Sequence, residues 1–114
     1  MKECNMRLSH KDISIITDTF QEYFNSGKIY LFGSRVDDSK KGGDLDLYIE
    51  YDKPTSFAAF YSQIKHFRKQ VFKKLNFYKV DVVYTYPKRE ERGIDKEGRN
   101  GILLFSFNSH LTTP

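Results

Sequence analysis

The sequence contains a single cysteine, Cys4, so it cannot form a disulfide framework within the chain. Its three histidines, His10, His66 and His110, stand apart from one another and from Cys4, without the spacing that zinc sites use. No apolar run approaches the length needed to cross a membrane, and the N-terminus lacks the apolar segment of a signal peptide. These absences argue against disulfide-rich, zinc-stabilised and membrane-spanning proteins, and we expect a cytoplasmic protein.

Aromatic residues are abundant, with 10 Phe and 8 Tyr among 114 residues, which favours a folded globule over disorder. The length predicts one domain over residues 1–114, with a core at about 10–105 and a flexible tail at 108–114. The net charge is +4, and basic residues concentrate in 65–74 and 88–99. This bias is compatible with a polyanion such as a nucleoside triphosphate or RNA, and equally with an ordinary soluble surface.

Hydrophobic periodicity predicts two long helices joined by strands. One helix follows an N-cap at Ser9 and covers about 10–26, and the other covers about 56–75 after a cap at Thr55 or Ser56. The predicted strands are Lys28–Phe32, Asp44–Tyr51, Lys79–Tyr86 and Ile102–Phe107. A helix within 88–100 is only weakly supported, because this segment contains Gly93 and Gly98. The order predicts an α/β (α+β) fold with helices on a small mixed sheet of three or four strands.

A glycine and a serine directly follow the first predicted strand. Gly33 lets the backbone approach a phosphate closely, and the amides and hydroxyl after it can donate to phosphate oxygens. Arg35 adds a positive charge next to them. Alone, this segment is more often an ordinary turn than a phosphate-binding loop.

Three aspartates lie on predicted strands, from which this residue is normally depleted. The strand Asp44–Tyr51 alternates, so we expect Leu45, Leu47 and Ile49 to face the core. Asp44, Asp46, Tyr48 and Glu50 then share the opposite face. With about 5 Å between the carboxylates of Asp44 and Asp46 and an effective dielectric constant of about 20, their repulsion costs about 3 kcal/mol. Divalent cations between the two carboxylates would remove this cost. The alternative is a solvated strand face, on which water screens the charges. Asp81 interrupts an apolar strand, where it either has a partner or faces water at the strand end.

Three features together form a specific pattern: Gly33-Ser34, then after nine intervening residues Asp44-Leu45-Asp46-Leu47, and Asp81 on a further strand. In this pattern the sequence resembles the nucleotidyltransferase superfamily that includes DNA polymerase β, in particular its small stand-alone members, the minimal nucleotidyltransferase (MNT) domains. The resemblance covers about residues 10–105. The sequence departs from it at Val36-Asp37-Asp38, where small members often have a second basic residue and a glycine.

The resemblance implies a nucleotidyltransferase fold and the transfer of a nucleoside monophosphate from a nucleoside triphosphate to a hydroxyl acceptor. The expected nucleoside triphosphate is ATP. Two Mg²⁺ ions would be the cofactor. The residues that it assigns to metal binding and catalysis are Asp44, Asp46 and Asp81, and those that it assigns to nucleotide binding are Gly33, Ser34 and Arg35. Small relatives are often paired with helical HEPN proteins in toxin–antitoxin pairs, so the resemblance also implies a partner of that kind that presents the acceptor.

Two other functions stay open at this stage. The same fold can act without catalysis, as a nucleotide-binding or partner-binding antitoxin module. A small RNA-binding protein is the third interpretation and rests on the basic segment 65–74, although Phe67 and Phe72 within it look like core residues. The aromatic residues of the helix at 56–75 spread more widely than one buried stripe requires. They belong either to a broad core helix or, with 102–107, to a surface for self-association or a partner protein.

Overall fold

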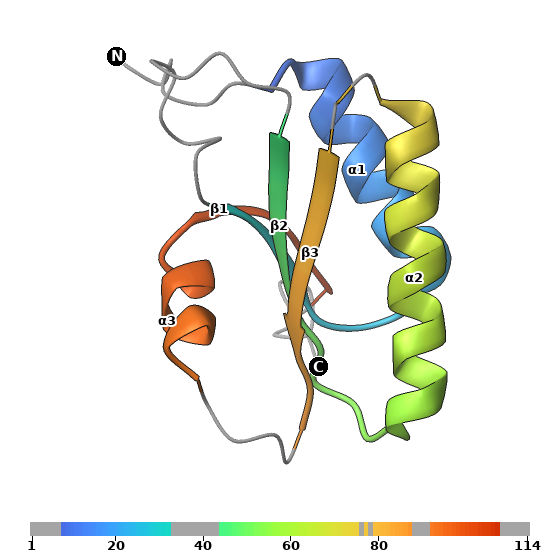
Figure 1. Ribbon diagram of the computed structural model, residues 1–114, viewed down its shortest axis with the longest axis vertical. Helices are drawn as coiled ribbons and strands as arrows, with labels where there is room; N and C mark the ends of the chain where they lie inside the picture. Colours follow the sequence, from blue (N-terminus) through green and yellow to red (C-terminus); the bar gives the residue numbers. More distant parts are fainter. Residues whose placement is uncertain (1–7, 33–43, 76, 78, 88–91, 108–114) are drawn as a thin grey trace, which may run out of the picture.

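The chain forms a four-stranded mixed sheet with helices on both faces (Figure 1). The computed structural model describes residues 8–32, 44–75, 77, 79–87 and 92–107, and of Asp44 only the backbone. The elements are, in chain order, α1 (His10–Tyr23), β1 (Lys28–Phe32), β2 (Asp44–Glu50), α2 (Phe57–Lys74), β3 (Lys79–Thr85), α3 (Gly93–Arg99) and β4 (Ile102–Ser106). This arrangement confirms the predicted fold class. Among the helices of these ranges, none is long and apolar enough to cross a membrane.

The strands are ordered β3-β2-β1-β4 across the sheet. β1 pairs antiparallel with β2 on one side and with β4 on the other, while β2 and β3 pair in parallel. A parallel pair needs a long crossover connection, and α2 supplies it between β2 and β3. The parallel pair therefore brings together residues that are far apart in the sequence.

Serine side chains cap both long helices: Ser9 as the sequence predicts, and Ser56 of the two candidates Thr55 and Ser56. The Ser9 Oγ accepts a hydrogen bond of 3.0 Å from the Asp12 backbone N–H, and the Ser56 Oγ accepts one of 3.2 Å from Ala59. The first helix is shorter than predicted, because it ends at Tyr23 rather than near residue 26. Gly27, with a φ of 99°, lies beyond the helix in the turn into β1.

The main core lies between the sheet and the pair α1 and α2. Leu45, Leu47 and Ile49 alternate along β2 and are fully buried on this face, as the sequence pattern predicts. The helices contribute aromatic rings, and those of Phe20 and Phe67 meet edge to face with centroids 6.2 Å apart. Because these three residues of β2 face the main core, the residues that alternate with them lie on the opposite face of the sheet.

The opposite face of the sheet is also partly covered, which the sequence analysis did not predict. Tyr48 was expected to point outward, but it is fully buried beneath α3. It forms a second, smaller core with Tyr30 and Phe32 of β1, and Val83 and Ile94 pack against it. The weakly supported helix within 88–100 therefore exists over part of that range and has a packing role.

Gly98 of α3 faces the buried Tyr48 ring, and a Cβ atom at this position would overlap the ring. Alanine normally stabilises a helix interior by about 1 kcal/mol relative to glycine. Here we expect Gly98→Ala to destabilise the protein by about 2 kcal/mol, because the packed ring has to move. Urea unfolding measures the difference. Gly93→Ala is the matched control, since its Cβ would meet open space, and it should be neutral or mildly stabilising; an equally stable Gly98→Ala would contradict this packing.

Four large apolar side chains in the described ranges are exposed: Phe57 (50%), Tyr61 (40%), Phe72 (46%) and Leu103 (49%). The interpretation of Phe72 as a core residue is therefore wrong, whereas Phe67 is fully buried as predicted. Helical geometry explains the error. Val71 follows Phe67 by one turn and takes the buried position, which rotates Phe72 away from the core.

Candidate active site

The sheet register brings two of the three predicted aspartates together. Asp46 of β2 is paired with Asp81 of β3, and Phe32, the last residue of β1, is the antiparallel partner of Asp46. Neighbouring strands lie roughly 5 Å apart, so the two aspartate backbones are adjacent. This end of the sheet is also where β1 leads into Gly33 and Ser34 in the sequence.

Both aspartates lie on the face of the sheet that carries α3. Asp46 is two residues from Tyr48 of the second core, and Asp81 is two residues from Val83, which packs against that core. Asp46 is partly buried, whereas the Asp81 side chain is 49% exposed. The site is therefore accessible to a ligand at Asp81.

Lys79 is a residue of this site that the sequence analysis missed. Its Nζ lies 3.4 Å from the Asp81 Oδ2, and both side chains are about half exposed. The i, i+2 spacing on a strand predicts that the two share a face, so the signal was present in the sequence. Lys79 is also the register partner of Asp44. Asp81 thus has a partner, and a positive charge offsets part of the negative charge of the site.

Other predicted site residues lie outside the described part of the chain. These are Gly33, Ser34 and Arg35, together with the side chain of Asp44, whose backbone begins β2. Among the described side chains, no three His, Cys, Asp or Glu residues cluster closely enough to hold a metal ion. The adjacent Asp46 and Asp81 still offer hard oxygen donors of the kind that Mg²⁺ prefers, so this donor set fits a divalent cation.

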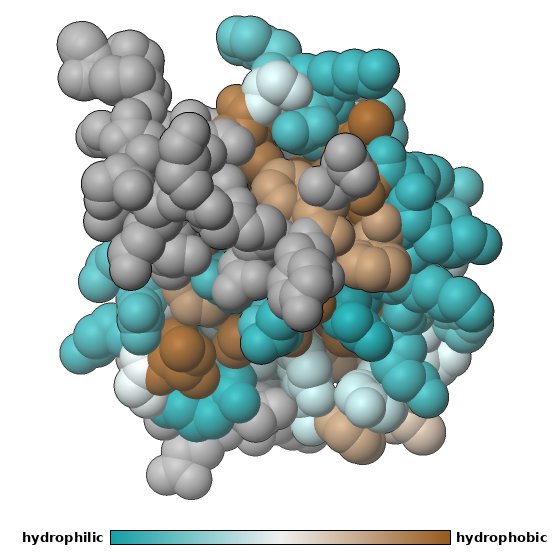
Figure 2. Space-filling model, turned by 45° about the horizontal axis from the view of Figure 1, so that its top comes forward, coloured by the Kyte–Doolittle hydropathy of each residue, from teal (hydrophilic) through white to brown (hydrophobic). Residues whose placement is uncertain are grey.

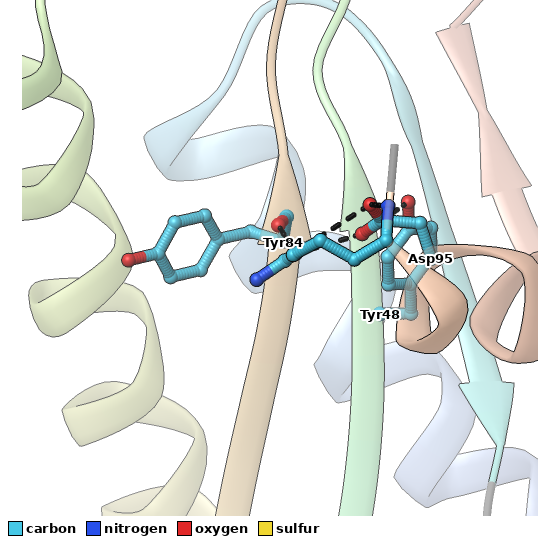
Figure 3. A network of polar contacts seen from close by, with 4 residues as sticks. Tyr48, Tyr84 and Asp95 are labelled. Carbon is cyan, nitrogen blue, oxygen red and sulfur yellow. Dashed lines mark hydrogen bonds and ion pairs between the residues drawn. The ribbon is translucent and has the colours of Figure 1, made fainter. Parts of the chain in front are cut away.

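An ion pair between the buried Asp95 and the partly exposed Arg92 connects α3 to the strands that carry the aspartates (Figure 3). Asp95 is 1% exposed and lies 2.7 Å from Nη2 of Arg92, which also donates to the Tyr84 carbonyl of β3 at 2.6 Å. Asp95 also accepts a hydrogen bond of 2.7 Å from the Arg92 backbone N–H at the start of the helix. The Tyr48 hydroxyl of β2 donates to Asp95 at 3.3 Å. The network therefore links α3 to both β2 and β3.

Burial and hydrogen bonding shift the ionisation of this network in opposite directions. Burial opposes the charge on Asp95, but the hydrogen bonds and charge of Arg92 outweigh it and lower the pKa of the carboxyl group. The pKa of Tyr48 is raised, first by burial and then by the negative charge of Asp95. At neutral pH the network therefore consists of a carboxylate, a guanidinium and a neutral phenol.

Residues 14–110 match the family described as Polymerase beta, Nucleotidyltransferase. The chain belongs to this family. Members of this nucleotidyltransferase family typically use divalent metal ions, and membership indicates nucleotide binding and transferase activity. Comparison with curated proteins finds no match. The mixed four-stranded sheet with its three helices in the described ranges is consistent with the fold of this family. The match covers almost all of the residues that the structure describes.

We expect Mg²⁺ to stabilise this nucleotidyltransferase through Asp81. A metal ion that binds only the folded state at about 100 times its Kd adds about 2.7 kcal/mol of stability. Asp81→Asn should lose most of that gain. Without metal it should change the unfolding free energy by less than about 1 kcal/mol, because its ion pair with Lys79 is exposed. Thermal unfolding with Mg²⁺ and with EDTA measures both values.

The matched control for this prediction is Asp18→Asn, which removes an exposed carboxylate of α1 away from the sheet. It should keep the full Mg²⁺ effect.

Asp44→Asn should leave the metal-free fold intact or stabilise it, because it removes one of the negative charges that repel each other when no metal is bound. Large destabilisation of the metal-free protein by Asp81→Asn or by Asp44→Asn would show that the aspartate is structural.

Proposed function

We propose that the chain transfers a nucleoside monophosphate from a nucleoside triphosphate, with ATP as the expected donor, to a hydroxyl group on a partner protein. The observation that carries this proposal is the parallel register that sets Asp46 beside Asp81, at the end of the sheet where β1 leads into Gly33 and Ser34. Membership of the nucleotidyltransferase family supports the reaction class.

Asp44, Asp46 and Asp81 would hold two Mg²⁺ ions, which supply charge neutralisation at the triphosphate and make the acceptor hydroxyl easier to deprotonate. The acceptor oxygen bonds to the α-phosphorus, the bond from this phosphorus to the bridging oxygen of the β-phosphate breaks, and pyrophosphate leaves. In this proposal Asp81 also orients the acceptor hydroxyl and accepts its proton.

The residues after β1 would bind the leaving group. The backbone amides at Gly33 and Ser34 and the serine hydroxyl donate to the terminal phosphates, and Arg35 offsets their charge. Lys79 offsets the negative charge that Asp81 carries before substrate binds.

We assign the acceptor to a separate protein, a helical HEPN-type partner in a toxin–antitoxin pair. Every helix within the described ranges packs on the sheet, so none forms a separate lobe for a large acceptor. A neighbouring gene that encodes a small helical protein of this type would identify the partner to test.

The test is transfer of label from an α-labelled nucleoside triphosphate to that partner in the presence of Mg²⁺. We expect label on the partner, none with EDTA, and none from a γ-labelled nucleotide, since the γ-phosphate leaves with pyrophosphate. Comparing the common nucleotides identifies the donor. Tight binding of the partner without any transfer would instead assign the chain as a non-catalytic antitoxin module.

A further inference from the structure

Helix α2 carries several positively charged side chains and no acidic side chain that would offset them. Between Phe57 and Lys74 it contains five Lys and Arg residues and no Asp or Glu. Lys74 lies 3.6 Å from Glu22 of α1. In contrast, none of the acids that the structure describes forms an ion pair with Lys65, Arg68 or Lys69. The outer side of α2 therefore keeps its positive charge.

These cations line a groove between α2 and the edge strand β3. The groove has a volume of about 490 Å³, and its lining residues are Lys65, Arg68, Lys69, Phe72, Lys79 and Val80. Arg68 donates a hydrogen bond of 3.4 Å to the Val80 carbonyl and so joins the helix to the strand. Figure 1 shows the C-terminal half of α2 running beside the start of β3. In Figure 2, hydrophilic residues predominate along the right edge, the side on which α2 lies in Figure 1.

Exposed aromatic rings lie on both sides of these cations along the same side of α2. Phe57 and Tyr61 stack with ring centroids 5.4 Å apart and an interplanar angle of 13°. The Lys65 Nζ lies 5.0 Å from the centroid of the Tyr61 ring. Phe72 ends the row within the groove. Spacings of three and four residues keep this row on one side of the helix, over about 22 Å.

We propose that this surface, from Phe57 and Tyr61 to the groove at Phe72, binds single-stranded nucleic acid. Cations that follow a phosphate backbone, combined with exposed rings on which bases stack, are the physical requirements for such a ligand. A duplex hides its base faces and cannot use the rings. Lys79 belongs both to the groove and to the ion pair with Asp81, so the bound strand passes next to the site. Binding needs neither nucleotide nor Mg²⁺ and goes beyond the proposed transfer reaction.

The experiment is fluorescence anisotropy of labelled oligouridylate and oligothymidylate of about 16 nucleotides with the full chain, in EDTA and without triphosphate. The two strands distinguish RNA from DNA as the preferred ligand. The groove contains four cations, Lys65, Arg68, Lys69 and Lys79, and each can contact one phosphate. We therefore expect the logarithm of the association constant to fall with the logarithm of the salt concentration at a slope of about −3, since each contact contributes about 0.7. The double variant K65A/K69A should make the slope shallower by about 1.4.

The matched control is K11A/K96A, which removes the same charge from exposed positions on α1 and α3. It should leave affinity and slope nearly unchanged. Phe72→Ala should weaken binding about tenfold at fixed salt, since stacking is worth about 1–3 kcal/mol per base, and should leave the slope unchanged. Phe72 is half exposed, so this variant should keep its fold, which circular dichroism checks.

Three outcomes would overturn the proposal. Equal weakening by K11A/K96A would show that only net charge matters. An unaffected Phe72→Ala variant would remove the stacking contribution. Competition by polyglutamate as strong as by the oligonucleotides would assign the surface to an acidic protein partner. Because the assay contains no triphosphate, failure here leaves the transfer reaction standing, and loss of transfer leaves this binding standing.

Discussion

Asp46→Asn is expected to lower nucleotide transfer by about a thousandfold or more. Metal-ion catalysis contributes several kcal/mol of transition-state stabilisation, and each step of about 1.4 kcal/mol is a factor of ten in rate. Asp46 is two residues from Asp44 in the sequence and is the register partner of Asp81, so we expect its carboxylate to serve the whole proposed metal site. Label transfer from the α-labelled nucleotide, at saturating Mg²⁺, measures the rate.

The control is again Asp18→Asn, which should transfer at the wild-type rate. The far-ultraviolet circular dichroism of Asp46→Asn should match that of the wild type, because Asp46 contributes no side chain to either hydrophobic core. A correctly folded Asp46→Asn variant with undiminished transfer would remove this aspartate from the mechanism and leave the reaction to other residues.

Asp95→Ala is expected to have the largest effect on stability, a loss of about 3 kcal/mol. Removing one member of a buried ion pair typically costs about 3–5 kcal/mol. We choose the lower end because the Arg92 side chain is 36% exposed and keeps some hydration. The variant also leaves the Tyr48 hydroxyl without its acceptor. Urea unfolding measures the loss, and Glu97→Ala, an exposed position of the same helix, should change little.

The effect of Asp95 should depend on pH in a defined direction. The folded-state pKa of its carboxyl group lies below the ordinary value, so its contribution is complete above about pH 4, the unfolded-state pKa. The contribution is lost as the pH falls through the lower, folded-state value. The difference in unfolding free energy between wild type and Asp95→Ala should therefore be constant near neutrality and shrink in acid. A difference that grew in acid would contradict the ion pair.

Local patterns in the sequence determined most of the fold. The strand Lys28–Phe32 was predicted with its observed bounds, because an apolar run ends abruptly before Gly33. The alternation in β2 correctly identified Leu45, Leu47 and Ile49 as core residues. Helix caps are similarly local, since Ser56 accepts its hydrogen bond from a residue only three positions away. Such features depend on neighbouring residues and need no knowledge of the rest of the chain.

The features that the sequence did not reveal depend on contacts between distant segments. Tyr48 looked solvent-facing because α3, which covers it, begins far along the chain at Gly93. Asp46 and Asp81 were identified separately, but their adjacency depends on which strands pair and in what register. The Asp95 network was missed for the same reason, since Tyr48 and Tyr84 lie on different strands.

Parallel pairing of β2 with β3 makes the site sensitive to chain length in some places and tolerant in others. The segments that join α2 to the two strands can gain or lose residues without changing which residues of β2 and β3 face each other. One residue inserted between Asp46 and Leu47 would instead turn either the aspartate or the leucine to the wrong side of the sheet. Length variation among homologous chains should therefore concentrate in the crossover and avoid the strands, because a single inserted residue would disrupt the hydrophobic core and the acidic site together.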